Sequence, residues 1–186
     1  MYPISPRNLS NHELEHELLA PSQVNEQTDS LPPQTSGGGL QRKLDIAREL
    51  LLRRLTPKLR DQCMMESPEQ IREWLQLHCA GLEHEVLLVL YLNIKHQVID
   101  AEPLFRGGLG HSLVSIREVV KAALAHNAAA VIVAHNHPSG SDEPSSKDLE
   151  LTRTLKAALV TCEMTLLDHF LIAGTNVVSF AERRWL

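Results

Sequence analysis

Apolar and polar positions follow two different periods along the last two thirds of the chain. Continuous apolar runs occupy most of 85–92 and all of 129–134, which is typical of strands buried on both faces. Helices are expected at 68–80, 116–126 and 146–160, the second of them opened by a capping box of Ser115 and Glu118. Further strands are expected near 97–101 and at 165–172 and 176–179. This order predicts an α/β fold, with a mixed β-sheet and flanking helices.

The N-terminal third has a different pattern. Apolar residues recur at helical spacing over 40–55 and predict an amphipathic helix, which should end near Leu55 because Pro57 restricts the backbone of Thr56. Pro32-Pro33 and Gly37-Gly38-Gly39 have the composition of a linker. We therefore divide the chain into a flexible or degenerate arm at 1–39, a basic helical segment at 40–67 and a folded domain at 68–186.

Composition adds limits to this picture. The chain has 186 residues, which corresponds to one domain of ordinary size with an N-terminal appendage. Three cysteines without a Cys-x-x-Cys pair indicate reduced thiols. The sequence has neither a signal-peptide pattern nor an apolar run near the ~20 residues of a membrane span. We expect a soluble, cytoplasmic protein.

His135, His137 and Asp148 are the clearest candidates for metal ligands. Three nitrogen and oxygen ligands with no fourth protein ligand nearby suit a hydrolytic zinc site, because the open position holds the water to be activated. A structural zinc site usually closes its shell with a fourth ligand, commonly a cysteine, and all three cysteines lie elsewhere in the sequence. This pattern predicts bound Zn²⁺.

The spacing of these ligands has a structural explanation. Side chains at positions i and i+2 of a strand point to the same side, so both histidines can face one ion at the end of strand 129–134. A turn at Pro138-Ser139-Gly140 follows, and Ser145 or Ser146 is expected to cap the next helix. Asp148 would then lie in the first helical turn, within reach of the histidines.

At these residues the chain resembles the JAMM (MPN+, JAB) metalloprotease superfamily, and more closely a bacterial RadC-type protein. The shared pattern is His-x-His-Pro followed by Ser-x-x-Asp, with a glutamate upstream. Asn136, the Pro-Ser-Gly segment, Leu167-Asp168-His169 and the run at 115–124 fit the RadC branch. The resemblance implies a JAB/MPN-type fold and a zinc-dependent hydrolase that cleaves a peptide or isopeptide bond in a protein or peptide substrate.

The resemblance also implies roles for residues outside the metal shell. A superfamily glutamate acts as general base on the metal-activated water, and Glu85 matches its position, with Glu83 as the alternative. Ser145 would help to bind the developing oxyanion or orient the water, besides capping its helix. Asp168 and His169 form either a buried polar pair or a support for a metal ligand.

His12-Glu13-Leu14-Glu15-His16 matches another zinc-protease pattern, His-Glu-x-x-His, which requires a long buried helix. Pro21 and the linker composition after it leave no room for such a helix. We therefore interpret this segment as a short opening helix without a zinc ion.

A basic segment favours a second function. Residues 41–60 carry seven basic side chains against two acidic ones, although the chain as a whole has a net charge of −5. By the resemblance to RadC-type proteins such a segment would be the remnant of a helix-hairpin-helix region, and DNA could bind along 40–60. Alternatively, the basic side chains form only a solvated face of the helix. The alternatives to a peptidase are therefore a DNA-associated accessory factor, a nucleic-acid hydrolase, or an interaction module that holds its metal without turnover.

Overall fold

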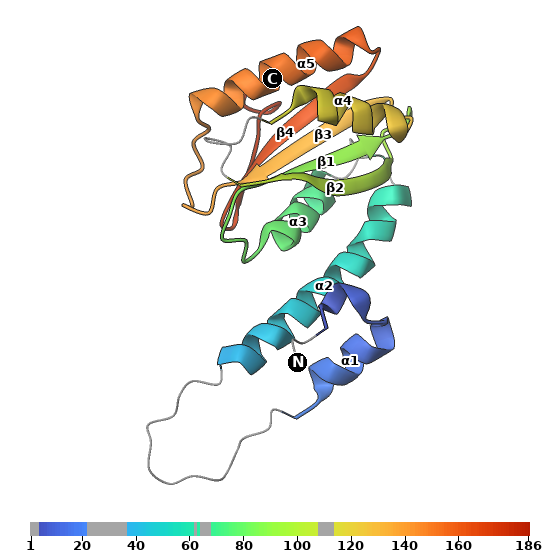
Figure 1. Cartoon of the computed structure of the whole chain (residues 1–186), viewed down its shortest axis with the longest axis vertical. Helices are drawn as coiled ribbons and strands as arrows, with labels where there is room; N and C mark the ends of the chain where they lie inside the picture. Colours follow the sequence, from blue (N-terminus) through green and yellow to red (C-terminus); the bar gives the residue numbers. More distant parts are fainter. Residues whose placement is uncertain (1–3, 22–36, 62, 64–67, 108–113) are drawn as a thin grey trace. The chain divides into compact units, whose positions relative to one another are not determined.

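The computed structural model describes residues 4–21, 37–61, 63, 68–107 and 114–186 (Figure 1). The chain divides into two compact units, Met1–Leu55 and Thr56–Leu186. The first unit contains helices only, and the second contains every strand of the described residues.

The N-terminal unit is built on two helices. A 3-10 turn, η1 (Pro6–Asn8), precedes α1 (Asn11–Leu19), and α2 (Gly37–Asp61) begins in the same unit. Ser10 and Glu13 form a capping box that opens α1. Leu14 and Ile46 are completely buried, so the unit has a small apolar core.

Helix α2 is longer than the sequence predicts. It continues through Pro57 to Asp61, whereas we expected an end near Leu55. Proline in a helix removes one backbone hydrogen bond, a cost that tertiary contacts can offset. Here Leu59 is only 2% exposed, and the hydroxyl of Thr56 accepts a hydrogen bond from the indole N–H of Trp74 at 3.2 Å. The boundary between the units still falls at Leu55 and Thr56, just before this proline.

Cations of α2 bind the segment that precedes it. Arg42 pairs with Glu17, with an Nε–Oε1 distance of 2.7 Å, and donates to the carbonyl of Ile4. Lys43 donates to the carbonyl of Ala20, just beyond the C-terminus of α1. Arg53 donates to Asn11 and to the carbonyls of Pro6 and Arg7.

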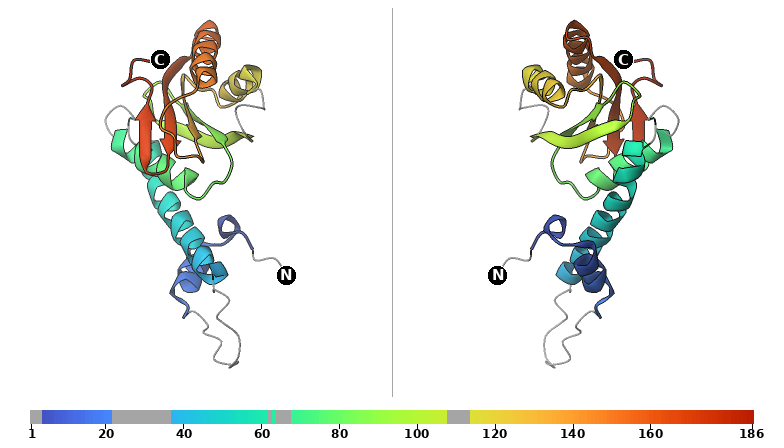
Figure 2. Two further views of the ribbon diagram at one scale, coloured as in Figure 1. Left: turned by 90° about the vertical axis from the view of Figure 1, so that its left-hand side faces the viewer. Right: turned by 90° about the vertical axis from the view of Figure 1, so that its right-hand side faces the viewer.

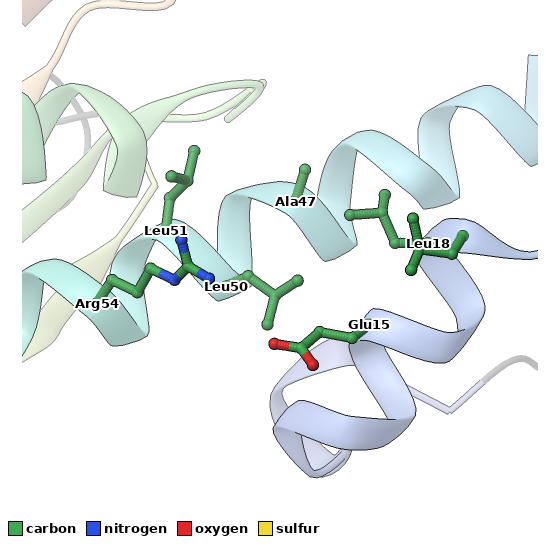
Figure 3. A pocket seen from close by; sticks show the side chains of 7 residues that line it. Glu15, Leu18, Ala47, Leu50, Leu51 and Arg54 are labelled. Carbon is green, nitrogen blue, oxygen red and sulfur yellow. The ribbon is translucent and has the colours of Figure 1, made fainter.

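A mainly apolar pocket of about 400 Å³ lies between α1 and α2 within this unit (Figure 3). Leu19 and Leu51 remain exposed at it. The lining residues are Glu15, Leu18, Leu19, Ala47, Leu50, Leu51 and Arg54.

The C-terminal unit is a five-stranded mixed sheet with helices on both faces, which confirms the predicted α/β class (Figure 2). The strand order is β2-β1-β3-β4-β5, in which only β3 and β4 are parallel. The strands are β1 (Val86–Leu92), β2 (Val98–Arg106), β3 (Ala130–Asn136), β4 (Thr165–Ala173) and β5 (Asn176–Ser179). The helices are α3 (Pro68–Cys79), α4 (Ile116–Ala125) and α5 (Ser146–Thr161).

Alternation along the central strands separates the two faces of the sheet. Val89 and Val133 belong to the core cluster beneath α4 and α5, together with Leu155 and Leu159 of α5. Helix α3 lies on the opposite face (Figures 1 and 2). His135 is two residues after Val133 in β3, so its side chain points toward the face covered by α5.

One local expectation is wrong and a second gave too short a strand. Ser115 is the N-cap residue of α4, but its side chain makes no capping hydrogen bond, and the Glu118 carboxylate pairs with Lys121. The strand expected near 97–101 extends to Arg106 and includes Pro103. A proline is tolerated there because β2 is an edge strand.

Other expectations agree with the described residues. All three cysteines are free thiols. None of the helices found in the described ranges is both long and apolar enough to cross a membrane. The sequence also indicates a glycine-rich loop at Gly107, Gly108 and Gly110, of which only Gly107 lies within the described ranges.

Candidate metal centre

The end of β3 places both histidines beside one point. His135 is in the strand and is completely buried, and His137 follows directly after the strand. The amide of His137 donates to the carbonyl of Ile172 at 2.8 Å, which extends the pairing with β4 by one residue. The chain then turns at Gly140, whose φ of 79° is favourable for glycine.

Asp148 reaches the same point from the N-terminus of α5. Ser145 is the N-cap residue, as predicted, and its hydroxyl accepts from the Asp148 amide at 3.2 Å. In return, Asp148 Oδ2 accepts from the Ser145 amide at 2.7 Å and from its hydroxyl at 2.6 Å. The carboxylate is therefore held in one orientation although it is almost fully buried.

The candidate ligand atoms lie close enough together to bind one metal ion. The Nε2 atoms of His135 and His137 are 3.2 Å apart. They lie 3.6 and 3.7 Å from the two carboxylate oxygens of Asp148. Atoms bound at about 2.0–2.1 Å to a tetrahedral zinc ion lie about 3.3–3.4 Å from one another. Across the described part of the chain, these residues form the one cluster whose geometry suits a metal ion.

Hydrogen bonding and burial prepare the imidazoles for a cation. His137 Nδ1 is 2.8 Å from the carbonyl oxygen of Ser141, which can only accept, so in the neutral ring the lone pair is on Nε2 of His137. Burial lowers the pKa of His135 to about 4, despite the opposing effect of the Asp148 charge. His135 is therefore neutral near pH 7, the form that binds metals.

A polar pocket of about 370 Å³ opens at this cluster. Glu85 lines it together with His137 and Asp148. Ser139, Ser141, Glu143, Ser145 and Lys147 complete the lining.

The pairing of β1 with β3 explains the position of Glu85. Leu87 is opposite His135, so the same antiparallel register extended by two residues sets Glu85 opposite His137. The side chains at 85 and 87 point to the same face as His135. Glu83 is exposed in a bend and is not among the lining residues, so of the two glutamates the structure brings Glu85 to the pocket.

Asn136, between the two histidines, points to the opposite face and binds β1. Its Oδ1 accepts from the amide of Val86 at 2.8 Å, and its Nδ2 donates to the carbonyl of His84 at 3.1 Å. These two groups flank Glu85 in sequence. The pattern His-Asn-His therefore supplies two ligand candidates and one residue that fixes the backbone around Glu85, a role that sequence reasoning missed.

The Asp168-His169 pair lies behind His135. His169 is completely buried, and its Nε2 is 2.7 Å from His135 Nδ1. Asp168 binds the C-terminal segment instead. It accepts from the Ser179 hydroxyl at 2.5 Å, from the Ala181 amide at 3.0 Å and from the His169 amide at 2.7 Å. Burial raises the pKa of the Asp168 carboxyl, and it lowers that of His169 well below its ordinary value.

The N-terminal histidine pattern forms a short helix, as expected. His12 and His16 are exposed on α1, and Glu13 is used in the capping box with Ser10. These side chains have no buried environment that could hold an ion.

Comparison with known proteins agrees with the fold. The family described as a RadC-like JAB domain matches residues 65–185. The chain belongs to the RadC family. The JAB domain of this family accounts for the sheet, for helices α3 to α5 and for all the metal-ligand candidates.

Relatives of this RadC-family chain match about three quarters of its length. A UPF0758 protein of Janthinobacterium sp. (strain Marseille) is 48% identical over 140 residues, which is 75% of this chain and 62% of the relative. A UPF0758 protein of Dechloromonas aromatica (strain RCB) is 50% identical over 142 residues, 76% of this chain and 63% of the relative. The matched region thus spans less than two thirds of the length of these relatives.

Proposed function

We propose that this RadC-family chain is a zinc-dependent hydrolase that cleaves a peptide or isopeptide bond. The proposal depends mainly on one observation, the convergence of His135, His137 and Asp148 at the pocket that Glu85 also lines. Membership in a JAB-domain family supports a metal-dependent hydrolase. The identity of the metal as zinc and of the substrate bond as an amide goes beyond what family membership supports and is our proposal.

The proposed mechanism assigns each residue of the pocket a task. Bound zinc would activate a water molecule and polarise the carbonyl of the substrate. Glu85 takes the proton of the attacking water and returns it to the leaving amine. The backbone position of Glu85 at the pocket follows from the pairing of β1 with β3 and from the two hydrogen bonds of Asn136.

Ser145 has two tasks in this proposal. Its hydroxyl donates to Asp148 Oδ2, which orients the carboxylate toward the ion. It also lines the pocket, where rotation about its Cα–Cβ bond would allow the same hydroxyl to donate to the oxyanion of the substrate.

Contacts of α2 lead us to prefer a protein substrate over DNA. Arg42, Lys43 and Arg53 are engaged with η1, α1 and the residues around them. Fewer of the seven basic side chains of 41–60 are then available for phosphates, and counterion release scales with the number of phosphates neutralised.

Zinc content and hydrolysis of matched variants test the proposal. We expect about one zinc ion per wild-type chain, less in His137→Ala, and full metal content in Glu85→Gln. On a panel of peptide, isopeptide and nucleic-acid substrates, Glu85→Gln should lose about 10²–10⁴-fold in rate. Glu83→Gln, which changes an exposed glutamate two residues away, is the control and should keep wild-type activity.

Three results would contradict the proposal. Absence of bound zinc in the wild-type protein would contradict the zinc site. Equal losses of hydrolysis rate in Glu83→Gln and Glu85→Gln would contradict the assignment of Glu85 as the general base. Cleavage of nucleic acid alone, with dependence on His137, would replace the amide substrate by a phosphodiester.

A further inference from the structure

A buried chain of hydrogen bonds connects His135 to the backbone of Asp148 through His169 and Thr152. His135 Nδ1 is 2.7 Å from His169 Nε2. The other nitrogen of that ring, His169 Nδ1, is 2.6 Å from the hydroxyl oxygen of Thr152. Thr152 in turn lies 2.6 Å from the backbone carbonyl oxygen of Asp148. His135, His169 and Thr152 are all completely buried.

The placement of the hydrogens along these bonds starts from Thr152. We take its single hydroxyl hydrogen to point to the Asp148 carbonyl, which can only accept. Thr152 must then accept from His169 Nδ1–H, which leaves a lone pair on Nε2 of that neutral ring. His135 therefore donates through Nδ1–H. The outcome is an unprotonated Nε2 on His135, the atom that faces His137 and Asp148.

We propose that Thr152 and His169 are positioning residues that fix the tautomer and the ring orientation of His135 for metal binding. This inference rests on the proposed function, since it takes the His135, His137 and Asp148 cluster as the metal site. Histidine ligands usually donate their second N–H to an oxygen. In this proposal the acceptor is a second histidine, whose own Nδ1–H is held by the threonine hydroxyl.

The chain of hydrogen bonds also joins two of the ligands. It begins at the backbone carbonyl of Asp148 and ends at His135, whose Nε2 lies 3.6 Å from the Asp148 carboxylate. Helix α5 would thus supply one ligand through Asp148, and it supports the candidate ligand of β3 through Thr152, one helical turn later.

The surroundings of His169 hold its ring in place. Phe180 packs against it, with ring centroids 4.4 Å apart. The backbone amide of His169 donates to the Asp168 carboxylate at 2.7 Å, and its carbonyl accepts from the Phe180 amide at 3.0 Å. The buried Asp168-His169 pair therefore combines a backbone anchor with a ring that reaches the ligand.

Loss of the Thr152 hydroxyl should affect Nε2 of His135, because two hydrogen bonds, through His169, connect Thr152 to the His135 ring. In Thr152→Val, the buried His169 Nδ1–H loses its acceptor, and the other tautomer of this ring becomes favourable. His169 would then donate from Nε2 to His135 Nδ1, which moves the hydrogen of His135 onto Nε2. Metal binding must reverse both changes or leave the His169 N–H without a partner.

Histidine tautomers in the metal-free wild-type protein give the direct test. Two-bond ¹H–¹⁵N correlation spectra distinguish Nδ1–H from Nε2–H rings. We expect the Nδ1–H tautomer for both His135 and His169. An Nε2–H tautomer at His169 would overturn the proposal regardless of whether the protein binds zinc.

Zinc affinity of a matched pair of variants gives the second test. Competition with a chromogenic chelator should show affinity reduced about tenfold or more in Thr152→Val. Thr152→Ser, which retains the hydroxyl and loses the methyl group, should remain within about threefold of wild type. Absorption spectra of the Co²⁺-loaded proteins should differ from wild type in the valine variant only.

The outcomes separate this inference from the proposed function. Failure of the wild type to bind zinc contradicts the metal site itself. Normal zinc binding with equal affinities in wild type, Thr152→Val and Thr152→Ser overturns the positioning role of Thr152 and His169 but leaves the metal site intact. Thermal unfolding of the metal-free variants shows whether a substitution destabilises the whole fold. If it does, the tautomers of His135 and His169 in the wild-type protein test the proposal instead.

Discussion

At the residue scale, Asn136 links the metal ligands to the proposed base. Its neighbours in sequence, His135 and His137, belong to the candidate metal cluster, while its own amide group binds the backbone on both sides of Glu85. Asn136 is 4% exposed, so water cannot easily replace these hydrogen bonds. The short Asn side chain can accept from one backbone group and donate to the next, which a carboxylate or an aliphatic side chain cannot do.

We predict that Asn136→Ala displaces Glu85 while the candidate metal ligands keep their positions. Zinc affinity should stay within about threefold of wild type, because all three ligands remain. Hydrogen exchange at the Val86 amide should rise at least tenfold, because its acceptor is lost. Hydrolysis should fall in proportion to the misplacement of Glu85.

Asn93→Ala is the control for this variant. Asn93 also accepts from backbone amides, those of Lys95 and Gln97, in the turn between β1 and β2. It should leave both zinc affinity and exchange at Val86 unchanged. A large loss of zinc in Asn136→Ala would show that the asparagine holds the ligands themselves.

Asp168 allows a prediction about pH. Its pKa in the folded state lies above the ordinary value of 3.8, because burial outweighs the hydrogen bonds from Ser179, Ala181 and His169. The folded state therefore binds this proton more tightly than the unfolded state. Stability from this group is fully present below pH 3.8 and is lost as pH rises through the folded-state pKa.

We expect Asp168→Asn to be at least as stable as wild type at pH 7. The amide keeps an oxygen for the two backbone amides and can donate to the Ser179 hydroxyl, and it carries no buried charge. Asp168→Ala leaves buried donors without acceptors and should lower the free energy of unfolding by about 1–3 kcal/mol. Urea unfolding at pH 5 and pH 7 measures both, and equal losses in the two variants would contradict this explanation.

At the element scale, the cations of α2 serve the N-terminal unit. Arg42 bridges Glu17 of α1 and the carbonyl of Ile4. Exposed ion pairs contribute about 0–1 kcal/mol, and this pair is half-exposed on the glutamate side. Its effect should therefore be local and should concern the docking of α1 on α2.

Arg42→Gln should accelerate hydrogen exchange in α1 several-fold without changing exchange in the sheet. Lys58→Gln, in the same helix, is the control and should leave α1 unchanged. If Arg42→Gln instead left α1 intact and reduced the salt dependence of DNA binding, the cation would serve phosphates rather than the N-terminal unit.

The sequence predicted elements well where one local pattern dominates. The apolar runs of β1 and β3 and the Ser145 cap of α5 depend on neighbouring residues alone. The end of α2 was wrong because burial of Leu59 and the bond from Trp74 to Thr56 come from distant segments. The side chain of Ser115 could also not be predicted, since Lys121 competes for Glu118.

The same distinction applies to the site. The ligands follow from a strand, a turn and a helix start that are continuous in sequence. The position of His169 does not, because β4 shifts its register between the partners of Val131 and Ile132. Strict alternation would turn Leu166 and His169 to opposite faces, whereas the shift brings both to the face of α5. The role of Thr152 depends on this shift and was equally hidden.

At the scale of the whole molecule, the candidate metal site belongs to one unit. All its ligands, Glu85 and the chain through His169 lie within Thr56–Leu186. The RadC-like JAB domain match begins at residue 65, nine residues after the start of this unit. The last turns of α2 therefore belong physically to the unit but lie outside the family match.

Two truncated chains distinguish these boundaries. A chain of 56–186 retains Leu59 and the Thr56 hydroxyl that accepts from Trp74, whereas a chain of 68–186 loses both. Burial of a leucine contributes about 1.5–3 kcal/mol, and an unpaired buried indole N–H costs about 1–3 kcal/mol. We predict that 56–186 binds zinc with wild-type affinity, and that 68–186 unfolds at a lower urea concentration than 56–186.

Full zinc binding and equal stability in 68–186 would show that the end of α2 is dispensable. Loss of zinc binding in 56–186 would instead make the N-terminal unit part of the metal site.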